Sequence, residues 1–153
     1  MPTPADAFRE GLQLGPLGIP LTVTSQDPTG EGDRSSLFGD TVYVPSKDAA
    51  SVPHEAMHAN LRRVEQVVPG GVLAEGLLSR LAESAYGDKS QYLNPFERVA
   101  YGYQEGYTGQ PDKQYQKAVA DRPSGLIATP GNAVGSIADT LGRLLGKMQR
   151  PKK

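Results

Sequence analysis

The sequence predicts an α+β fold, in which a small sheet of short strands, one of them an edge strand, packs on three or more helices and an amphipathic helix follows at the C-terminus. Two stretches between residues 19 and 45 alternate apolar and β-branched residues, as strands do. Apolar residues recur at helical spacing over most of the later chain. Glycine (18 residues) and proline (13) make up about a fifth of the 153 residues, which favours short elements joined by turns.

Composition narrows the classes of protein to consider. The net charge of -1 gives no reason to expect nucleic acid as a partner. Cysteine is absent, which excludes disulfides and thiolate metal ligands. The first residues lack the basic start and apolar core of a signal peptide, and no apolar run has transmembrane length. We therefore expect a soluble chain, cytoplasmic or virion-associated, whose 37% apolar residues form one small core.

The N-terminal part is expected to contain a helix and two strands. Residues 5–14 are expected to form a short helix, residues 19–24 a strand, and residues 25–36 a loop or long hairpin connection. Residues 41–45 predict a second strand, and because Pro45 cannot donate to a ladder, we place this strand at an edge or terminus. Such an edge is able to hold an extended peptide by strand addition, although an ordinary strand is the alternative.

Residues 52–60 contain the motif H-E-x-x-H, and its His54 and His58 are the only histidines of the chain. Residues four apart lie on one face of a helix, so the two imidazoles are placed to bind one metal ion. Catalytic zinc keeps one of its four positions open for water, and Glu55 is placed to take a proton from that water. The alternative is a solvated helix face on which the motif arose by chance.

Three helices are expected around the motif. The first begins near Ser46 or Ser51 and ends near Val68, before a Pro-Gly-Gly sequence. The third begins at Asn94, which is placed to cap it, with Pro95 at the first helical position. The second spans residues 72–86 and carries an apolar stripe that we expect to be buried in the core, formed by Leu73, Leu77, Leu81 and Ala85.

The two histidines need a third protein ligand, and Glu97 in the third helix is our candidate. Glu65 lies on the same helix face as the histidines, but a rise of 1.5 Å per residue puts it roughly 10 Å beyond His58. Glu65 therefore cannot reach the same ion. Glu83 and Glu105 remain alternatives. Glu97 itself has a structural alternative, as an exposed residue in the first turn of a helix, where negative charge is favoured.

These motifs resemble those of gluzincin-type zinc metallopeptidases, in which H-E-x-x-H on one helix is completed by a glutamate from a later helix. The sequence H-E-A-M-H at residues 54–58, followed by N-P-F-E-R-V-A-Y at residues 94–101, is similar to small bacterial and phage members. The later helix of those members often carries an Asn-Pro-x-Glu-x-x-Ala-like signature. The resemblance covers about residues 40–105 and implies a small zincin-like domain. Its first motif is specific, and the second is moderately so.

The resemblance also implies roles for individual residues. His54, His58 and Glu97 would bind Zn²⁺, and Glu55 would be the general base. Tyr101 would donate its hydroxyl to the developing oxyanion. The chain has no room for the substantial second lobe of larger family members, which implies a substrate cleft that is shallow or completed by another chain.

The chain changes character after the third helix. We expect the zincin-like domain to span residues 1–120, with a short helix at 112–120, and a linker to span residues 121–132. An amphipathic, basic helix and tail are expected over residues 133–153. The apolar residues of this helix follow a and d spacing, at Val134, Ile137, Ala138, Leu141, Leu144, Leu145 and Met148.

An isolated amphipathic helix needs a surface to lie on. Its own domain is one such surface, and a protein partner or a second copy reached through residues 133–148 is another. A membrane surface is the least favoured of the three. Gly135, Gly142 and Gly146 lower the helix propensity but permit close approach of another helix.

Two functions follow from these features. The first is a zinc-dependent metallopeptidase, a hydrolase that cleaves peptide or protein substrates with metal-activated water. The second is a structural or assembly protein, for example a virion component, in which a zincin-like scaffold carries a C-terminal helix that binds a partner. Cleavage that depends on Glu55 is expected of the first, and a site covered by a neighbouring copy is expected of the second.

Overall fold

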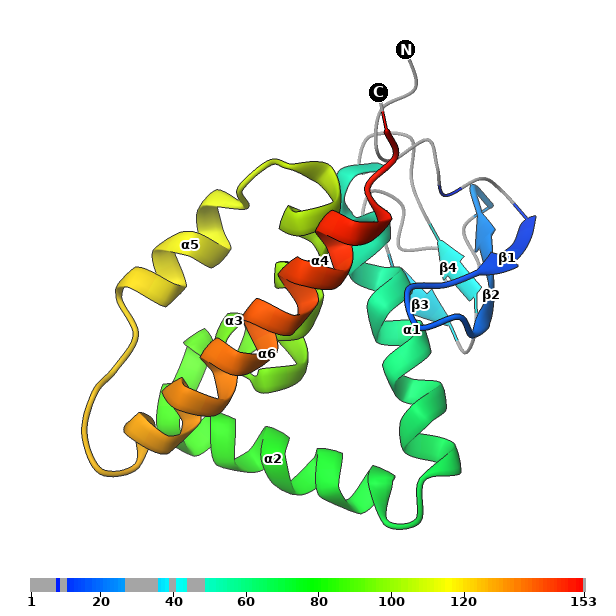
Figure 1. Cartoon of the computed structure of the whole chain (residues 1–153). Coiled ribbons are helices and arrows are strands. Elements are labelled where there is room, and N and C mark those ends of the chain that lie inside the picture. Colours follow the sequence, from blue (N-terminus) through cyan, green and yellow to red (C-terminus); the bar gives the residue numbers. More distant parts are fainter. Residues whose placement is uncertain (1–7, 9–10, 27–35, 39–40, 44–48, 153) are drawn as a thin grey trace.

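The computed structural model of the chain describes residues 8, 11–26, 36–38, 41–43 and 49–152 (Figure 1). In this part of the chain, the strands are β1 (Gly11–Leu14), β2 (Pro20–Thr24), β3 (Ser36–Phe38) and β4 (Thr41–Tyr43). The helices are α1 (Val52–Val67), α2 (Gly71–Tyr86), α3 (Ser90–Leu93), α4 (Pro95–Thr108), α5 (Lys113–Ala120) and α6 (Ala128–Gln149), with short 3-10 turns at Ala49–Ser51 and Gly87–Lys89. The predicted α+β class is confirmed.

The strands form one sheet in the order β1-β2-β4-β3. β2 and β4 are parallel, whereas the outer pairs are antiparallel. β4 therefore has a neighbour on each side. Of the two alternatives predicted from Pro45, an edge or a terminus, the edge is wrong for the described Thr41–Tyr43. Residues 44 and 45 lie outside the described residues. β3 has only three residues and lies in a loop-like stretch, so the sequence did not predict a strand there. The strand that occupies this edge of the sheet was therefore missed.

The helix expected at residues 5–14 is wrong for its C-terminal part, because Gly11–Leu14 is strand β1 and pairs with β2. Residues 5–7, 9 and 10 lie outside the described part of the chain. Leu12 and Leu14 are 78% and 68% exposed, so the apolar spacing in this segment does not mark a buried helix face. The strand predicted at residues 19–24 is confirmed as β2.

α1 lies between the sheet and α4 (Figure 1). One side of α1 packs on the sheet, in a buried cluster of Leu21, Val23, Val42, Ala56 and Ala59. Another side packs on α4, in a buried cluster of Met57, Ala100, Tyr103 and Tyr107. The motif helix is therefore held on two sides, and this fixes the direction in which its histidines point.

α2 lies across the base of the molecule, between the end of α1 and the start of α6 (Figure 1). The expectation that its apolar stripe is buried is wrong, because Leu73, Leu77 and Leu81 are 79%, 59% and 54% exposed. Of the residues in α2, only Ala82 and Tyr86 are buried, where the C-terminal end of the helix meets α3, α5 and α6. Helical spacing defined this face correctly, but no element of the described chain covers it.

α4 and α6 pack with their backbones in direct contact. Gly102 and Gly106 of α4 face α6, and Gly142 and Gly146 of α6 face α4. A Cβ atom added at any of these four positions would lie less than 3.0 Å from a carbonyl oxygen of the opposite helix. The prediction that glycines of the C-terminal helix permit close approach of another helix is confirmed at Gly142 and Gly146.

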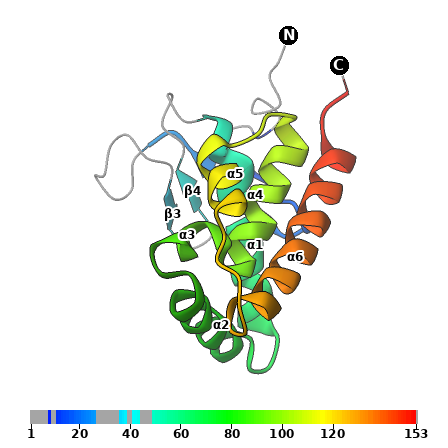
Figure 2. The same cartoon turned by 90° about the vertical axis from the view of Figure 1, so that its left-hand side faces the viewer.

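α6 lies alongside α4 (Figure 2). It docks there mainly through this glycine face, with Leu145 half-buried beside it. It begins at Ala128, so the last residues of the expected 121–132 linker are helical. Five of the seven apolar residues of the predicted stripe stay 50–81% exposed, at Val134, Ile137, Leu141, Leu144 and Met148. The other two, Ala138 and Leu145, are half-buried, and Leu145 packs against the cluster between α1 and α4. Among the described residues, no helix combines the length and the apolar character needed to cross a membrane.

Candidate metal centre

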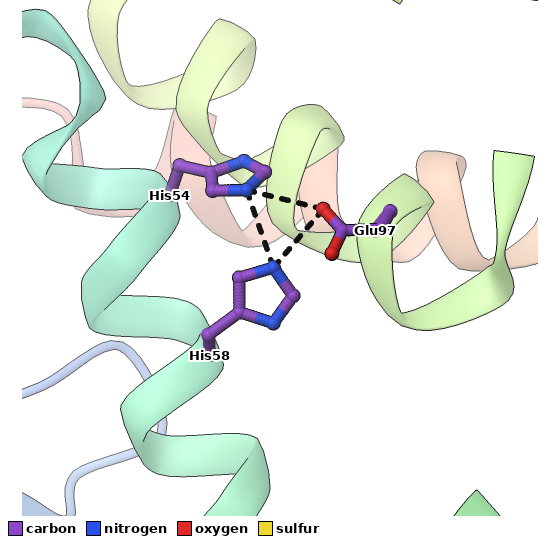
Figure 3. A group of neighbouring side chains, drawn as sticks. All are labelled: His54, His58 and Glu97. Atoms are coloured by element: carbon purple, nitrogen blue, oxygen red, sulfur yellow. Dashed lines mark hydrogen bonds and ion pairs between the residues drawn. The ribbon is translucent and has the colours of Figure 1, made fainter. Parts of the chain in front are cut away.

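His54, His58 and Glu97 converge on one point from two helices (Figure 3). Nε2 of His54 lies 3.2 Å from Oε2 of Glu97, and Nε2 of His58 lies 3.1 Å from the same oxygen. The two imidazole nitrogens are 3.2 Å apart. The fold therefore brings together the three residues that the sequence singled out as ligands.

The size of this triangle can be compared with the requirements of a metal ion. Two imidazoles and a carboxylate at about 2.0–2.2 Å from a tetrahedral zinc ion have their ligand atoms about 3.3–3.6 Å apart. The observed separations of 3.1–3.2 Å are close to this spacing. Three lone-pair acceptors that face one another need a cation or shared protons between them. The size and the donor chemistry of the group are therefore compatible with a bound metal ion.

α1 places the two histidines. It begins at Val52 and ends at Val67, close to the predicted bounds, and Pro53 lies in its first turn, where a missing N–H costs little. His54 and His58 are one turn apart on the side of α1 that faces α4 (Figure 3). His54 is buried, whereas the side chain of His58 is 22% exposed. The site therefore has a closed side at His54 and an open side at His58.

α4 places the glutamate. Asn94 caps this helix as predicted, because its Oδ1 accepts a hydrogen bond of 2.9 Å from the N–H of Phe96. Pro95 occupies the first helical position. Glu97 consequently lies in the first turn of α4, and its carboxylate points toward α1 (Figure 3). The cap is anchored to α2, since Asn94 Nδ2 donates to Ser79 Oγ at 3.1 Å.

The charged forms of Glu97 and His58 stabilise each other. Burial acts to raise the pKa of Glu97, but hydrogen bonds from His54 and His58 outweigh it and hold this pKa at about 2. Burial acts to lower the pKa of His58, but the hydrogen bond and charge of Glu97, with the charge of Glu55, raise it above 6.5. The metal-free site thus contains an ionised carboxylate at Glu97 and favours positive charge at the His58 imidazole.

Glu55 lines a cleft beside this group, together with His58 and Glu97. The cleft has a volume of about 380 Å³ and lies between α1, α2 and the start of α4. Its remaining lining is mostly polar, and consists of Leu61, Arg62, Glu65, Glu75, Ser79, Asn94 and Phe96. Glu55 therefore places a carboxylate on the accessible side of the site, in addition to the three converging residues.

Tyr101 packs its ring against His54. The two ring centroids are 4.2 Å apart, and the centroid of His58 lies 4.8 Å from that of His54. Metal-binding histidines usually donate their second N–H to a group that orients the ring. Nδ1 of His54 is buried without such a partner among the described residues, so ring contacts orient it instead. Burial and the negative charge of Glu97 raise the pKa of Tyr101, which keeps its hydroxyl protonated.

Sequence reasoning missed the support behind Tyr101. The ring of Tyr115, in α5, stacks on that of Tyr101 with centroids 4.6 Å apart and planes 10° apart. The Tyr115 hydroxyl donates to Asp139 of α6 and accepts from Nε of Arg98 of α4 at 3.3 Å. The short helix expected at residues 112–120 is confirmed as α5, but nothing in its sequence indicated that it would contact the third helix at this point.

The other carboxylates considered as ligands do not join the group. Glu105 is buried and engaged elsewhere, because it accepts hydrogen bonds of 2.7 Å from Arg143, from Gln116 and from the N–H of Asp112. Glu83 is exposed on α2. Glu65 lines the cleft but is not one of the three converging residues, as the helix geometry predicted.

Comparison of the chain with protein-family models, with curated proteins and with solved structures returns no match. These comparisons therefore supply neither a function nor a cofactor. The fold and the converging side chains define the class, which is a small α+β domain with a candidate metal centre on two packed helices.

Proposed function

We propose that this protein is a zinc-dependent metallopeptidase of the gluzincin type, which hydrolyses peptide bonds. The proposal is carried by one observation, namely the convergence of His54, His58 and Glu97 with ligand atoms 3.1–3.2 Å apart. Two imidazoles and a carboxylate form a ligand set of catalytic zinc, which leaves a fourth position for water or substrate. Glu55 lies next to that set and lines the adjoining cleft.

Each residue has one role in this proposal. His54, His58 and Glu97 would hold a zinc ion, which when bound would act as a Lewis acid toward water and a peptide carbonyl. The Glu55 carboxylate accepts a proton from water and later delivers it to the leaving amine. Tyr101 orients His54 through its ring and donates its protonated hydroxyl to the developing oxyanion.

The cleft beside Glu55 is the proposed substrate site. Its volume of about 380 Å³ is at the low end of the range for ligand pockets. We therefore expect it to contact a short stretch of an extended peptide on either side of the scissile bond. The rest of the substrate would lie on the surfaces of α1 and α2.

The first test measures zinc in the purified full chain and in four variants. We expect equimolar zinc in the wild type and in Glu55→Gln, and loss of zinc in His58→Ala and Glu97→Gln. Glu65→Gln is a matched control, because this glutamate lies on the same helix and lines the same cleft without joining the ligand group. Retention of zinc by His58→Ala would show that these residues do not hold the metal.

The second test measures cleavage of a fluorogenic peptide library by the same set. Glu55→Gln is expected to lose about 100-fold or more in rate, in keeping with the range for a general base, with its zinc content unchanged. The control for cleavage is Glu83→Gln, because Glu83 is exposed on α2 outside the cleft lining, and this variant should cleave like the wild type. Undiminished cleavage by Glu55→Gln would contradict the proposed mechanism, and no cleavage by a zinc-loaded wild-type chain would contradict the peptidase function itself.

A second candidate function is favoured by the exposed apolar faces of α2 and α6. Contiguous apolar surface of this kind is typical of proteins that assemble with others. In an assembly protein the zincin-like domain would act as a scaffold. Glu55→Gln would then leave the function of the assembled particle unchanged. This outcome separates the two candidates.

A further inference from the structure

We propose that α6 joins two copies of this chain through an antiparallel pair of α6 helices. The proposal concerns a surface away from the histidines and does not depend on the metal centre. It rests on which residues of α6 remain exposed, on which are already covered, and on the fit of the exposed stripe to itself.

The exposed apolar residues of α6 occupy consecutive a and d positions of a heptad. Val134, Leu141 and Met148 are at a, and Ile137 and Leu144 are at d. Each is 50–81% exposed. A stripe restricted to a and d is narrow, and it is typical of a seam that accepts one partner helix.

The opposite face of α6 is already covered, which leaves the seam as the surface for a partner. Gly142 and Gly146, at positions b and f, lie against the backbone of α4, and Gly135, also at b, lies against Arg98. Figure 2 shows α6 at the outer edge of the molecule, with α4 on its inner side. No element of the described chain lies over its outer side.

An antiparallel pair with full overlap of the two helices brings the seams into register. When the twofold axis crosses the seam at the level of residue 139, Val134 lies beside Leu144 of the second copy, and Ile137 lies beside Leu141 of the second copy. Each a residue then meets a d residue, as antiparallel coiled-coil packing requires. The same register separates the two basic C-terminal ends and opposes the two helix dipoles.

This register also places the Met148 side chain of one copy at an apolar groove of the other. Met148 of the second copy lies level with Pro130, which borders a groove of about 230 Å³ between α2 and the start of α6. Leu81, Ile127 and Val134 also line this groove. Met148 is 81% exposed in one copy and is flexible enough to fill an irregular space. The end of one seam therefore complements the groove at the start of the other.

The area available is sufficient for a specific dimer. α6 has 22 residues. It is thus about 33 Å long, and half of the circumference of a helix about 11 Å wide gives roughly 600 Å² per copy. This reaches the lower bound of about 1,200 Å² in total for specific protein–protein interfaces. Leu126 and Ile127, which are 97% and 73% exposed beside the groove, add to it.

The first experiment measures the mass of the full chain by light scattering after size-exclusion chromatography. We expect twice the chain mass for the wild type and the chain mass for Leu141→Lys. Leu77→Lys is the matched control, because Leu77 of α2 is 59% exposed and Leu141 is 60% exposed. The control should remain a dimer, and circular dichroism should show the same helix content in all three proteins.

The second experiment determines the direction of the two helices by crosslinking. The chain has no cysteine, so a single introduced thiol is specific. Thr140 is exposed at position g, near the proposed twofold axis, and in an antiparallel pair it lies close to Thr140 of the second copy. Thr140→Cys should therefore crosslink with a short bismaleimide. Ser136→Cys, exposed on the same helix but off the seam, should not crosslink.

The outcomes are distinct. A monomeric wild-type chain, or a dimer that Leu141→Lys leaves intact, overturns the proposal. A monomer that pellets with anionic phospholipid vesicles overturns it in favour of a bilayer as the covering surface. A dimer in which Thr140→Cys fails to crosslink overturns the antiparallel arrangement. Loss of zinc or of peptide cleavage in the histidine variants has no bearing on these results.

Discussion

Tyr101 contributes to the candidate site in two ways that substitutions can separate. Its ring lies against His54, and its hydroxyl is kept protonated by burial. In the proposed mechanism, these two features correspond to two separate roles, namely orientation of a ligand and donation of a hydrogen bond. Phenylalanine retains the first role alone, whereas leucine retains neither.

We predict that Tyr101→Phe binds zinc like the wild type but cleaves peptides more slowly. Tyr101→Leu should weaken zinc affinity by about 10-fold or more, because groups that orient a ligand typically contribute this much. Competition with a chromogenic chelator measures the affinity. Tyr92→Leu is the control, because the Tyr92 ring contacts Tyr101 at 5.7 Å and is not paired with either histidine. Equal zinc affinity in Tyr101→Leu and the wild type would exclude the orienting role.

At the scale of elements, the contact between α4 and α6 holds the helix that carries Glu97. The two backbones touch at four glycines, so side chains cannot be added there without separating the helices. The same interface contains an ion pair between Glu105 of α4 and Arg143 of α6, and Arg143 also pairs with Asp139 of its own helix. Close packing and buried charge therefore act together to position α4.

We predict that Gly142→Ala lowers the free energy of unfolding by about 1–3 kcal/mol, the usual cost of inserting a methyl group into close-packed surroundings. The added Cβ would overlap the carbonyl oxygen of Val99. Urea unfolding measures the change. Gly76→Ala is the matched control, because a methyl group at Gly76 of α2 would meet open space, and the change should stabilise by about 0.5–1 kcal/mol. Similar effects of the two substitutions would contradict close α4–α6 packing.

We predict that Arg143→Met destabilises the chain by about 3 kcal/mol, because it leaves the buried carboxylate of Glu105 without its ion-pair partner. The lower end of the usual range applies, since the Arg143 side chain is 31% exposed and Gln116 still donates to Glu105. Urea unfolding is again the measurement. Lys117→Met, which removes an exposed charge from α5, should change stability by less than about 0.5 kcal/mol.

At the scale of the whole molecule, the candidate metal centre lies between the two main parts of the fold. The histidines belong to α1, which packs on the sheet, and Glu97 belongs to α4, which packs on α6. An ion bound between them would therefore oppose separation of the two parts. The stability of the molecule should then depend on zinc.

We predict that saturating zinc stabilises the wild-type chain by about 2.7 kcal/mol at 100 times the dissociation constant. For a chain of this size, this corresponds to a rise in Tm of about 5–10 °C. Thermal unfolding with zinc and with EDTA measures the shift. Glu97→Gln should show little or no shift, and a rise equal to that of the wild type would place the bound zinc elsewhere.

Local sequence determined much of the site and of the elements that carry it. The spacing of His54 and His58 requires one helix face, and Asn94 with Pro95 determines where α4 begins and hence where Glu97 lies. These predictions held because each depends on backbone geometry over a few residues. The α+β class followed in the same way, from patterns read within single segments.

Only the tertiary structure decided which apolar faces are covered and how the strands are ordered. The stripe of α2 and the seam of α6 have the spacing of core residues, but both are exposed, and α6 docks through glycines instead. β4 became an inner strand because β3 pairs with it. Periodicity within a segment specifies a face, whereas burial depends on distant residues that pack against it, and no local pattern contains that information.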